Sequence, residues 1–340
     1  MLHAKSPTIS QPLDCAIEHG GDLAAARRLY PDAPQPWIDL STGINPHAWP
    51  CGPLSTDSLT RLPAPAALAE LERIAAAAYG LPDATPIVAA PGAQALIQAL
   101  PRLIPGRRVG VLGPTYAEHA ASWRYAGREV VICAKVEQLA ACDIAVVVNP
   151  NNPDGRIVPV DVLLSLSRAT QLVVDESFAD FTPAMSFAAA GPAAGALVLR
   201  SFGKAYGLAG VRLGFAIGPQ RLLDALRADL GPWAVSGPAI EIGTGALADV
   251  DWRAQMADRL GAEARRLDAL LAGAGCTIVG GASLFRLADH ARCDALAERL
   301  GRAGVYVRRF AENPRWMRLG LPPQDGWARL EAALANGAPS

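Results

Sequence analysis

Short apolar runs alternate with stretches of helical periodicity through the middle of the sequence, and this alternation is the strongest constraint on the fold. Two of the runs, Ala-Val-Val-Val at 145–148 and Leu-Val-Val at 172–174, are uninterrupted and rich in valine. Such runs are typical of strands that are buried on both faces, as in a parallel sheet covered by helices. The sequence therefore predicts an α/β fold whose large domain holds a mostly parallel, seven-stranded sheet between helices.

Seven runs are the candidate strands of this sheet, and helices are expected between them. The strands are expected at Ile87–Ala90, Arg108–Leu112, Val130–Cys133, Ile144–Val148, Leu172–Asp175, Leu197–Arg200 and Leu213–Ile217. The helices are expected at Ala93–Leu103, Tyr116–Ala126 and Val160–Ala169.

The two ends of the sequence depart from this alternation. Residues 1–60 are rich in Pro and Gly, which predicts an extended arm with one short helix at Asp22–Tyr30. Beyond Trp233, two long helices (Pro238–Leu247 and Asp251–Gly273) precede an α+β tail. The strands of the tail are expected near Cys276–Val279, Leu284–Leu287, Val305–Arg308 and Trp316–Leu319. We expect an N-terminal arm or lid at 1–45 that partly joins the small domain, a large domain at 46–245 and a small α+β domain at 246–340.

Composition excludes several classes of protein. The 31 Lys and Arg residues balance 32 Asp and Glu, so the chain lacks the basic charge of a nucleic-acid-binding protein. The longest weakly polar stretch, Phe187–Leu199, is interrupted by Gly and Pro and is shorter than the roughly 18 residues that cross a bilayer. No apolar signal segment is visible at the N-terminus. Six scattered cysteines without a Cys-x-x-Cys pair argue against a metal site or disulfides. We therefore expect a cytoplasmic enzyme that binds neither metal, nucleic acid nor membrane.

Polar residues follow the predicted central strands at the edge of the sheet where open α/β folds bind ligands. Gly92, Ala93 and Gln94 begin a helix whose free N–H groups suit a phosphate. Asp175 ends one strand, and Lys204 follows another after Arg-Ser-Phe-Gly. A phosphate site, a carboxylate for a cationic ring nitrogen and an amine for an aldehyde together indicate pyridoxal phosphate.

Three motifs carry a family resemblance. They are Asn-Pro-Asn-Asn-Pro-Asp-Gly at 149–155, Val-Asp-Glu-Ser-Phe at 174–178 and Ser-Phe-Gly-Lys-Ala-Tyr-Gly-Leu-Ala-Gly-Val-Arg-Leu-Gly at 201–214. Residues 87–218 thereby resemble the fold-type I superfamily of pyridoxal-phosphate enzymes, the aspartate-aminotransferase-like group. The resemblance implies that Lys204 forms the Schiff base with the cofactor and that Asp175 pairs with its pyridine nitrogen.

The same resemblance implies roles for further residues of the site. Asn152 is expected to bond the 3′-oxygen of the cofactor ring, and Tyr116 to stack on that ring. Ser201 and Arg212 are expected on its phosphate. Arg318, in Trp-Met-Arg-Leu-Gly, falls where the superfamily keeps the arginine that binds the α-carboxylate of the substrate.

The N-terminal part narrows the resemblance. Glu-His-Gly-Gly-Asp at 18–22 and Trp-Ile-Asp-Leu-Ser-Thr-Gly-Ile-Asn-Pro at 37–46 resemble the L-threonine-O-3-phosphate decarboxylases of cobalamin biosynthesis, a family similar to histidinol-phosphate aminotransferase. This implies decarboxylation of L-threonine O-3-phosphate to (R)-1-amino-2-propanol O-2-phosphate. The expected substrate-binding residues are His19, Gly43, Ile44, Asn152, Arg308 and Arg318. Arg308 and His19 are the candidates for the substrate phosphate, and for His19 a turn histidine bonded to the backbone is the alternative.

Two positions depart from the superfamily pattern. Phe178 stands where a Tyr commonly bonds the 3′-oxygen, and Leu62 stands where many relatives send a Tyr to the cofactor phosphate of the partner subunit. Both changes disfavour an ordinary aminotransferase. An aminotransferase acting on histidinol phosphate or a related phosphorylated amino compound remains the alternative. A non-enzymatic scaffold is a third hypothesis, against which the intact Lys204 and Asp175 argue.

Two further expectations concern assembly and the other histidines. Relatives of fold-type I are usually dimers with sites at the interface, so we expect a homodimer. The histidines without a matching pattern are expected to be structural or at the surface, and these are His3, His47, His119 and His290.

Overall fold

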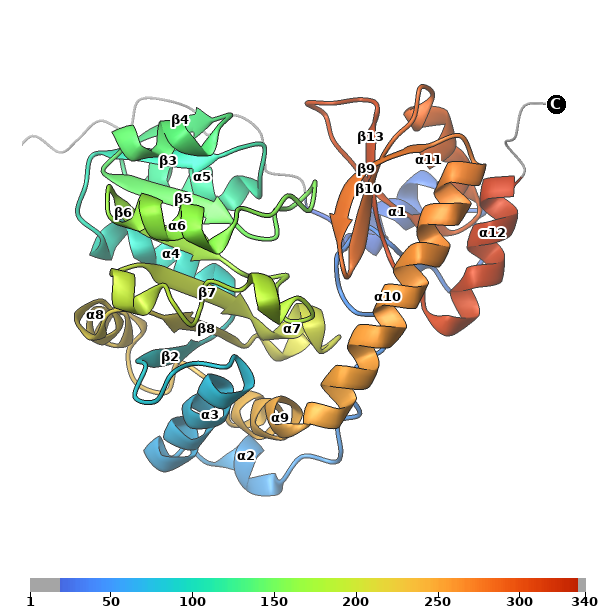
Figure 1. Ribbon diagram of the computed structural model, residues 1–340. Coiled ribbons are helices and arrows are strands. Elements are labelled where there is room, and N and C mark those ends of the chain that lie inside the picture. Colours follow the sequence, from blue (N-terminus) through green and yellow to red (C-terminus); the bar gives the residue numbers. More distant parts are fainter. Residues whose placement is uncertain (1–18, 336–340) are drawn as a thin grey trace, which may run out of the picture.

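Seven strands form one large sheet in the computed structural model, which describes residues 19–335 (Figure 1). The strands are β2 (Ile87–Ala90), β3 (Arg108–Leu112), β4 (Glu129–Cys133), β5 (Ile144–Val148), β6 (Gln171–Asp175), β7 (Leu197–Ser201) and β8 (Gly214–Ile217). Their order is β2-β8-β7-β6-β5-β3-β4, and β8 runs antiparallel to both neighbours while the other pairs are parallel. The predicted α/β fold is confirmed, and each predicted strand of this sheet lies within one residue of its observed bounds.

Helices cover both faces of the large sheet, which explains the apolar character of its strands. In β5, Ile144 and Val146 belong to the core that packs under α4, α5 and α8, whereas Ala145 and Val147 belong to the core under α6. Helices α3 and α9 pack together at the β2 end of the sheet. The helices of this part are α2 (Thr56–Thr60), α3 (Pro65–Ala78), α4 (Ala93–Leu103), α5 (Ala117–Tyr125), α6 (Val160–Ser167), α7 (Phe202–Ala205), α8 (Gln220–Leu230) and α9 (Gly237–Ala248).

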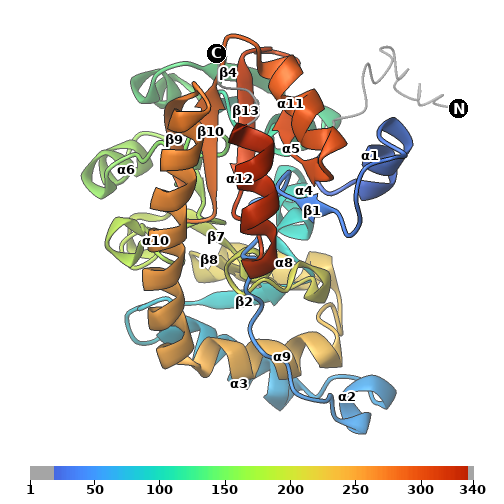
Figure 2. The same ribbon diagram turned by 90° about the vertical axis from the view of Figure 1, so that its right-hand side faces the viewer.

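The C-terminal part builds a second, smaller sheet beside the first. Its strands pair antiparallel in the order β12-β13-β10-β9, and α10 and α12 lie side by side against it (Figure 2). The elements are β9 (Thr277–Ala282), β10 (Phe285–Asp289), β12 (Arg308–Arg309), β13 (Trp316–Gly320), α10 (Val250–Gly273), α11 (Cys293–Arg302) and α12 (Trp327–Ala335). Among the described helices, even the long α10 lacks the apolar content that crossing a membrane requires.

The N-terminal arm differs from the prediction in two respects. Residues 1–60 contain a second short helix, α2, besides α1 (Leu23–Leu29), because the Ser55 side chain accepts a hydrogen bond from the first turn of α2. The single strand predicted at Val305–Arg308 is divided. Its first half, β11 (Val305–Tyr306), pairs with β1 (Ile38–Asp39) of the arm, and its second half, β12, pairs with β13. The part of the predicted arm before residue 19 lies outside the described residues.

At one place, the large and small parts of the molecule touch through backbone atoms rather than side chains. The turn at 149–155, which follows β5, lies against β9 of the small sheet. A Cβ atom at Gly155 would overlap the carbonyl oxygen of Gly281, and a Cβ atom at Gly280 would overlap that of Asp154. Gly155 also has a φ of +71°, which other residues rarely adopt. The contact therefore requires glycine on both sides.

A buried ion-pair cluster fixes the carboxyl ends of β6 and β7, next to the cavity described below. Arg200 Nη1 lies 2.9 Å from Glu176 Oε2, Arg200 Nη2 lies 3.3 Å from Asp180 Oδ1, and all three side chains are almost fully buried. The guanidinium also stacks over the Tyr79 ring, 4.3 Å from its centre. Burial alone would lower the pKa of Arg200, but the two carboxylates outweigh it and raise the pKa. The arginine therefore stays charged and holds both acidic side chains in place.

Replacing Arg200 with Met should lower the free energy of unfolding by about 3–5 kcal/mol, because the buried carboxylates of Glu176 and Asp180 would lose their cationic partner. Urea denaturation followed by circular dichroism measures the loss. The control is Arg61→Ala, since Arg61 and its partner Asp57 are largely exposed and such a pair contributes less than about 1 kcal/mol. Equal effects of the two substitutions would contradict the role of the cluster.

Candidate active site

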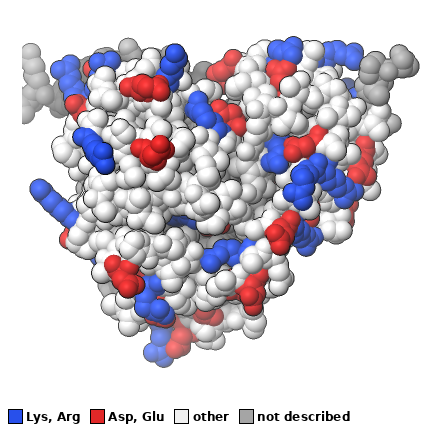
Figure 3. Space-filling model, in the orientation of Figure 1, with Lys and Arg blue, Asp and Glu red and all other residues white. Residues whose placement is uncertain are grey.

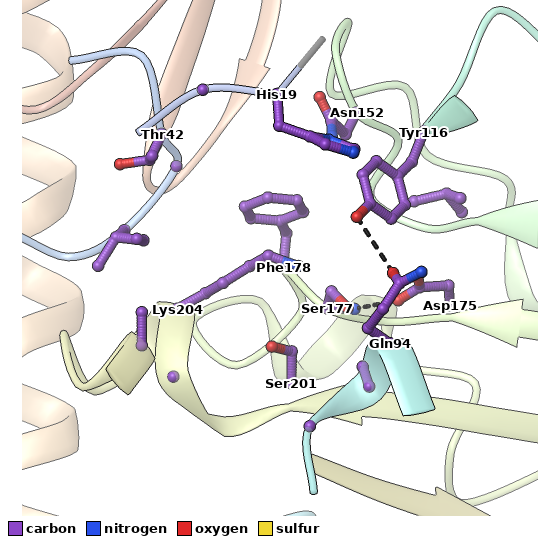
Figure 4. Close-up of a pocket in the computed structure, with 18 of the residues that line it drawn as sticks. His19, Thr42, Gln94, Tyr116, Asn152, Asp175, Ser177, Phe178, Ser201 and Lys204 are labelled. Atoms are coloured by element: carbon purple, nitrogen blue, oxygen red, sulfur yellow. Dashed lines mark hydrogen bonds between the residues drawn. The ribbon is translucent and has the colours of Figure 1, made fainter. Parts of the chain in front are cut away.

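A cavity of about 340 Å³ lies at the carboxyl edge of the large sheet, where residues of the N-terminal arm and of the small sheet close it (Figure 4). All the predicted cofactor-binding residues line it, and these are Gly92, Ala93, Gln94, Tyr116, Asn152, Asp175, Ser201, Lys204 and Arg212. The predicted substrate-binding residues His19, Gly43, Ile44 and Arg318 line it too. Positive and negative side chains intermix over the face shown in Figure 3, so this face presents no broad field of one sign.

Arg308 is the predicted site residue that does not line the cavity. Its Cα atom pairs with that of Arg318 across β12 and β13. Its guanidinium lies 5.6 Å from the centre of the Phe310 ring. The structure therefore places Arg308 beside a cavity residue rather than among those that form the wall.

Lys204 lies in α7, one turn after the end of β7, and its side chain extends into the cavity (Figure 4). The loop that contains Asn45 fixes the backbone of Lys204. The Asn45 backbone N–H donates to the Lys204 carbonyl at 2.9 Å, and the Asn45 side-chain amide donates to the Ala205 carbonyl at 2.8 Å. The amine lies 4.5 Å from the centre of the Phe178 ring. Burial lowers the pKa of Lys204, while the Asp175 carboxylate opposes this shift. A lysine with a lowered pKa is suited to react with a carbonyl compound.

Asp175 ends β6 and is 3% exposed. Its Oδ2 lies 2.9 Å from His119 Nε2, and its Oδ1 accepts the Ser177 N–H at 2.9 Å. Burial alone would raise the pKa of Asp175, but the hydrogen bond and charge of His119, with the charge of Lys204, lower it to about 2. The site therefore holds a carboxylate that is ionised at neutral pH, which suits a cationic ring nitrogen.

The sequence analysis gave His119 no role at the site and expected it to be structural or at the surface. It is buried, and its Nε2 pairs with Asp175, so it is a structural support of the site carboxylate. Tyr116 and His119 lie three residues apart at the start of α5, and this spacing places both on one side of the helix. The spacing from Tyr116 is a signal that the sequence does contain.

An anion cradle forms where α4 begins. Gly92 caps this helix with a φ of +84°, and a Cβ atom there would lie 2.8 Å from Arg212 Nη2. Gly214 is equally constrained, because a Cβ atom on it would lie 2.5 Å from the Ala93 nitrogen. The cradle thus combines free N–H groups of a helix N-terminus with a guanidinium, which together favour a phosphate.

Arg318 and Asn152 connect the two sheets across the cavity. Arg318 donates through Nη1 to Asn152 Oδ1 and through Nη2 to the Ser41 carbonyl at 2.7 Å. Its Nε is buried without a hydrogen-bond partner among the described residues. Burial, and then the charge of Arg308, lower the pKa of Arg318 to about 10. A buried guanidinium with an unsatisfied donor is suited to bind a carboxylate.

His19 takes part in a side-chain network at the mouth of the cavity. Its Nε2 lies 2.9 Å from Glu118 Oε1, and the Gln94 side chain donates to Glu118 Oε2 at 3.0 Å. The Tyr116 hydroxyl donates to Gln94 Oε1 at 3.2 Å (Figure 4). The alternative of a histidine bonded to the backbone is therefore wrong, because the partner of His19 is a carboxylate on α5.

These residues fit pyridoxal 5′-phosphate. The ionised Asp175 matches its ring nitrogen, the cradle between α4 and Arg212 matches its phosphate, and the Lys204 amine matches its aldehyde. The cradle requires glycine at both Gly92 and Gly214, because a Cβ atom there would collide with Arg212 or with the Ala93 nitrogen.

Comparisons with known proteins agree with this geometry. Residues 36–333 match the model of the family "Aminotransferase class I and II". Threonine-phosphate decarboxylase of Pseudomonas aeruginosa is 45% identical over 94% of this chain and 97% of its own length. The protein of that name from a Sinorhizobium species is 41% identical over 95% and 99%, respectively. The crystal structure of histidinol-phosphate aminotransferase from Sinorhizobium meliloti in complex with pyridoxal-5′-phosphate superposes with a TM-score of 0.79 at 20% identity, covering 97% of this chain and 98% of that one.

Similarity over nearly the full length, and a site that fits the cofactor bound by a structural neighbour, lead to one conclusion. The chain belongs to the class I and II aminotransferase family and, within it, to the threonine-phosphate decarboxylases.

Proposed function

We propose that this protein decarboxylates L-threonine O-3-phosphate to (R)-1-amino-2-propanol O-2-phosphate, a step of cobalamin biosynthesis. The observation that carries the proposal is the meeting of Lys204, Asp175 and Arg318 in one cavity of a chain that is 45% identical to a threonine-phosphate decarboxylase. The cavity supplies an amine, an ionised carboxylate and a buried guanidinium, which are the groups that a phosphorylated amino acid and its cofactor require.

Pyridoxal 5′-phosphate is the cofactor, and it withdraws electrons from the substrate Cα when bound, so that a bond at Cα can break. We assign its phosphate to Ser201, Arg212 and the N-terminus of α4. We assign its ring nitrogen to Asp175. We assign the hydrogen bond to the 3′-oxygen to Asn152, and the stacking contact with the ring face to Tyr116.

The substrate is held at the opposite side of the cavity. Arg318 would bind the α-carboxylate, and its position decides which bond at Cα is aligned to break. The substrate phosphate would lie near His19, Arg308 and the backbone of Gly43 and Ile44. Lys204 would deliver the proton that Cα receives when CO2 leaves.

The direct test is incubation of the cofactor-loaded enzyme with L-threonine O-3-phosphate. CO2 and the amino-alcohol phosphate are the expected products. Conversion that depends on an added keto acid and releases no CO2 would instead identify an aminotransferase for histidinol phosphate or a related compound.

Replacing Lys204 with Ala should lower the rate of CO2 release by about 1000-fold or more, because the amine and its proton are lost. It should also abolish the covalent label that borohydride reduction leaves on the loaded wild-type protein, measured by mass spectrometry. Lys135→Ala is the matched control, since Lys135 is exposed and does not line the cavity. Retention of the covalent label in the Lys204→Ala protein would refute the assignment.

Replacing Arg318 with Lys should lower kcat/KM for the phosphorylated substrate by about 10- to 100-fold, because lysine keeps the charge but loses the two-pronged donor. Initial rates over a range of substrate concentrations measure the change. Arg309→Lys is the control, since Arg309 is exposed and pairs with the exposed Asp294. Equal values for both variants would exclude Arg318 as the carboxylate ligand.

We propose that the protein acts as a homodimer through the surface of α2 and its neighbouring loops. Leu54, Leu59, Leu62 and Trp233 are exposed large apolar side chains. Gly237, at the start of α9, packs closely against the Ser58 carbonyl of α2, and Trp233 precedes Gly237 by only four residues. The labels of Figure 1 show α2 and α9 next to each other. Grouped apolar side chains of this kind mark protein interfaces.

Leu62→Glu should therefore convert a dimer into a monomer, because it places a charge in the apolar interface. Light scattering coupled to size-exclusion chromatography measures the mass. Leu29→Glu is a matched control, since Leu29 and Leu62 are both 67% exposed. A Leu62→Glu protein with the mass of the wild type would place the interface elsewhere.

The same proposal covers domain organisation and cellular location. We place the boundaries of the arm, the large domain and the small domain at 1–45, 46–245 and 246–340. The pairing of β1 with β11 supports assigning part of the arm to the small domain. We place the protein in the cytoplasm, because the cysteines of the described residues are unpaired thiols.

A further inference from the structure

The phenyl ring of Phe178 lies where three parts of the site meet. The Lys204 Nζ lies over its face, 4.5 Å from the ring centre. The Phe285 ring of the small sheet meets it edge to face at 4.9 Å. The backbone of Gly43 approaches so closely that a Cβ atom there would lie 2.8 Å from Phe178 Cε1. The ring is only 6% exposed, so its position is determined from all of these sides.

We propose that Phe178 is a positioning residue whose ring face holds the ammonium form of Lys204, so that the lysine gives a proton to the substrate Cα rather than taking one from it. This inference rests on the proposed function and names the residue that directs the same site toward decarboxylation.

The two reactions need opposite protonation states of one atom. In decarboxylation, the bond between Cα and the carboxylate breaks, CO2 leaves, and the electron pair ends in a new Cα–H bond whose proton comes from Lys204 Nζ. The ammonium thereby becomes a neutral amine. Transamination begins instead with a neutral amine at Nζ that removes the proton from Cα. A group that stabilises the ammonium therefore favours the first reaction.

Besides the Phe178 ring, four charged side chains act on the Lys204 amine. The carboxylates of Asp175 and Asp180 favour the ammonium, whereas the guanidiniums of Arg318 and Arg212 and the burial of the amine disfavour it. These effects oppose one another, so contact with the ring can shift the equilibrium between the ammonium and the neutral amine of Lys204. Attraction between an ammonium and an aromatic face is strong enough to move a pKa by about one unit. Figure 4 shows the Lys204 side chain extended toward Phe178.

The chain offers an unusually direct measurement, because its sequence contains only three lysines, Lys5, Lys135 and Lys204. Full-length, cofactor-free protein labelled with ¹³C-lysine would give few side-chain NMR signals. In the wild type, the ring current of Phe178 should shift the Lys204 Cε protons upfield of those of the other two lysines. Absence of this shift would overturn the proposal without any variant.

Two substitutions separate the ring face from the volume of the side chain. Phe178→Leu should remove the upfield shift and lower the Lys204 pKa by about one unit, whereas Phe178→Tyr, which keeps the aromatic face, should preserve both. Phe187→Leu is the control for the loss of a buried phenyl ring, since Phe187 is buried away from the cavity. An unchanged Lys204 pKa in a folded Phe178→Leu protein would refute the proposal.

The loaded enzyme gives an independent readout. For Phe178→Leu, the amount of cofactor converted to its amine form per CO2 released should rise several-fold over the wild type, with no rise for Phe187→Leu. An unchanged ratio would contradict the role of Phe178 in directing the reaction. If the wild type released no CO2, the proposed function would fail, while the NMR titration would still decide whether Phe178 holds the ammonium.

Discussion

The buried carboxylate of Asp175 is the constraint on which the site depends. A carboxylate at the end of a central strand stays ionised only if it has partners that outweigh its desolvation. His119 and the Ser177 N–H supply these partners, and β6 fixes the side chain because both of its neighbours in the sheet pair along it. The charge of Asp175 then acts on Lys204 across the cavity. The large sheet thus holds one ionised carboxylate in a buried position, where protein partners replace the water that would otherwise solvate it.

The large sheet could be predicted from sequence because its strands carry their own signal. Strands such as β5 are buried on both faces and consist of apolar residues throughout, so their bounds are visible without any tertiary information. The division of residues 305–309 into β11 and β12 has no such local signal, because it depends on pairing with β1, far away in the sequence. Helix α2 spans only Thr56–Thr60, which is too short for a periodic pattern.

The site shows the same division between local and distant information. Motifs around Asp175 and Lys204 lie in the sequence itself, and the cavity gathers almost every residue chosen from them. His119 and Asp175 are 56 residues apart in the chain, and their pairing depends on the packing of α5 against the sheet. Arg308 was expected in the site because the substrate phosphate needs a cationic partner, but it does not line the cavity, and its guanidinium lies by the Phe310 ring.

The glycine contact between the turn at 149–155 and β9 has a consequence for how this chain tolerates change. The separation of the large and small halves is set there by the thickness of two peptide backbones. A single methyl group added at Gly155 or Gly280 would act as a wedge, and it would tilt β9 together with β10, its hydrogen-bonded neighbour, and with β13, which pairs with β10. Arg318 is part of β13, so this displacement would move it away from Asn152. Harm to substrate binding can thus originate at residues that never meet the substrate.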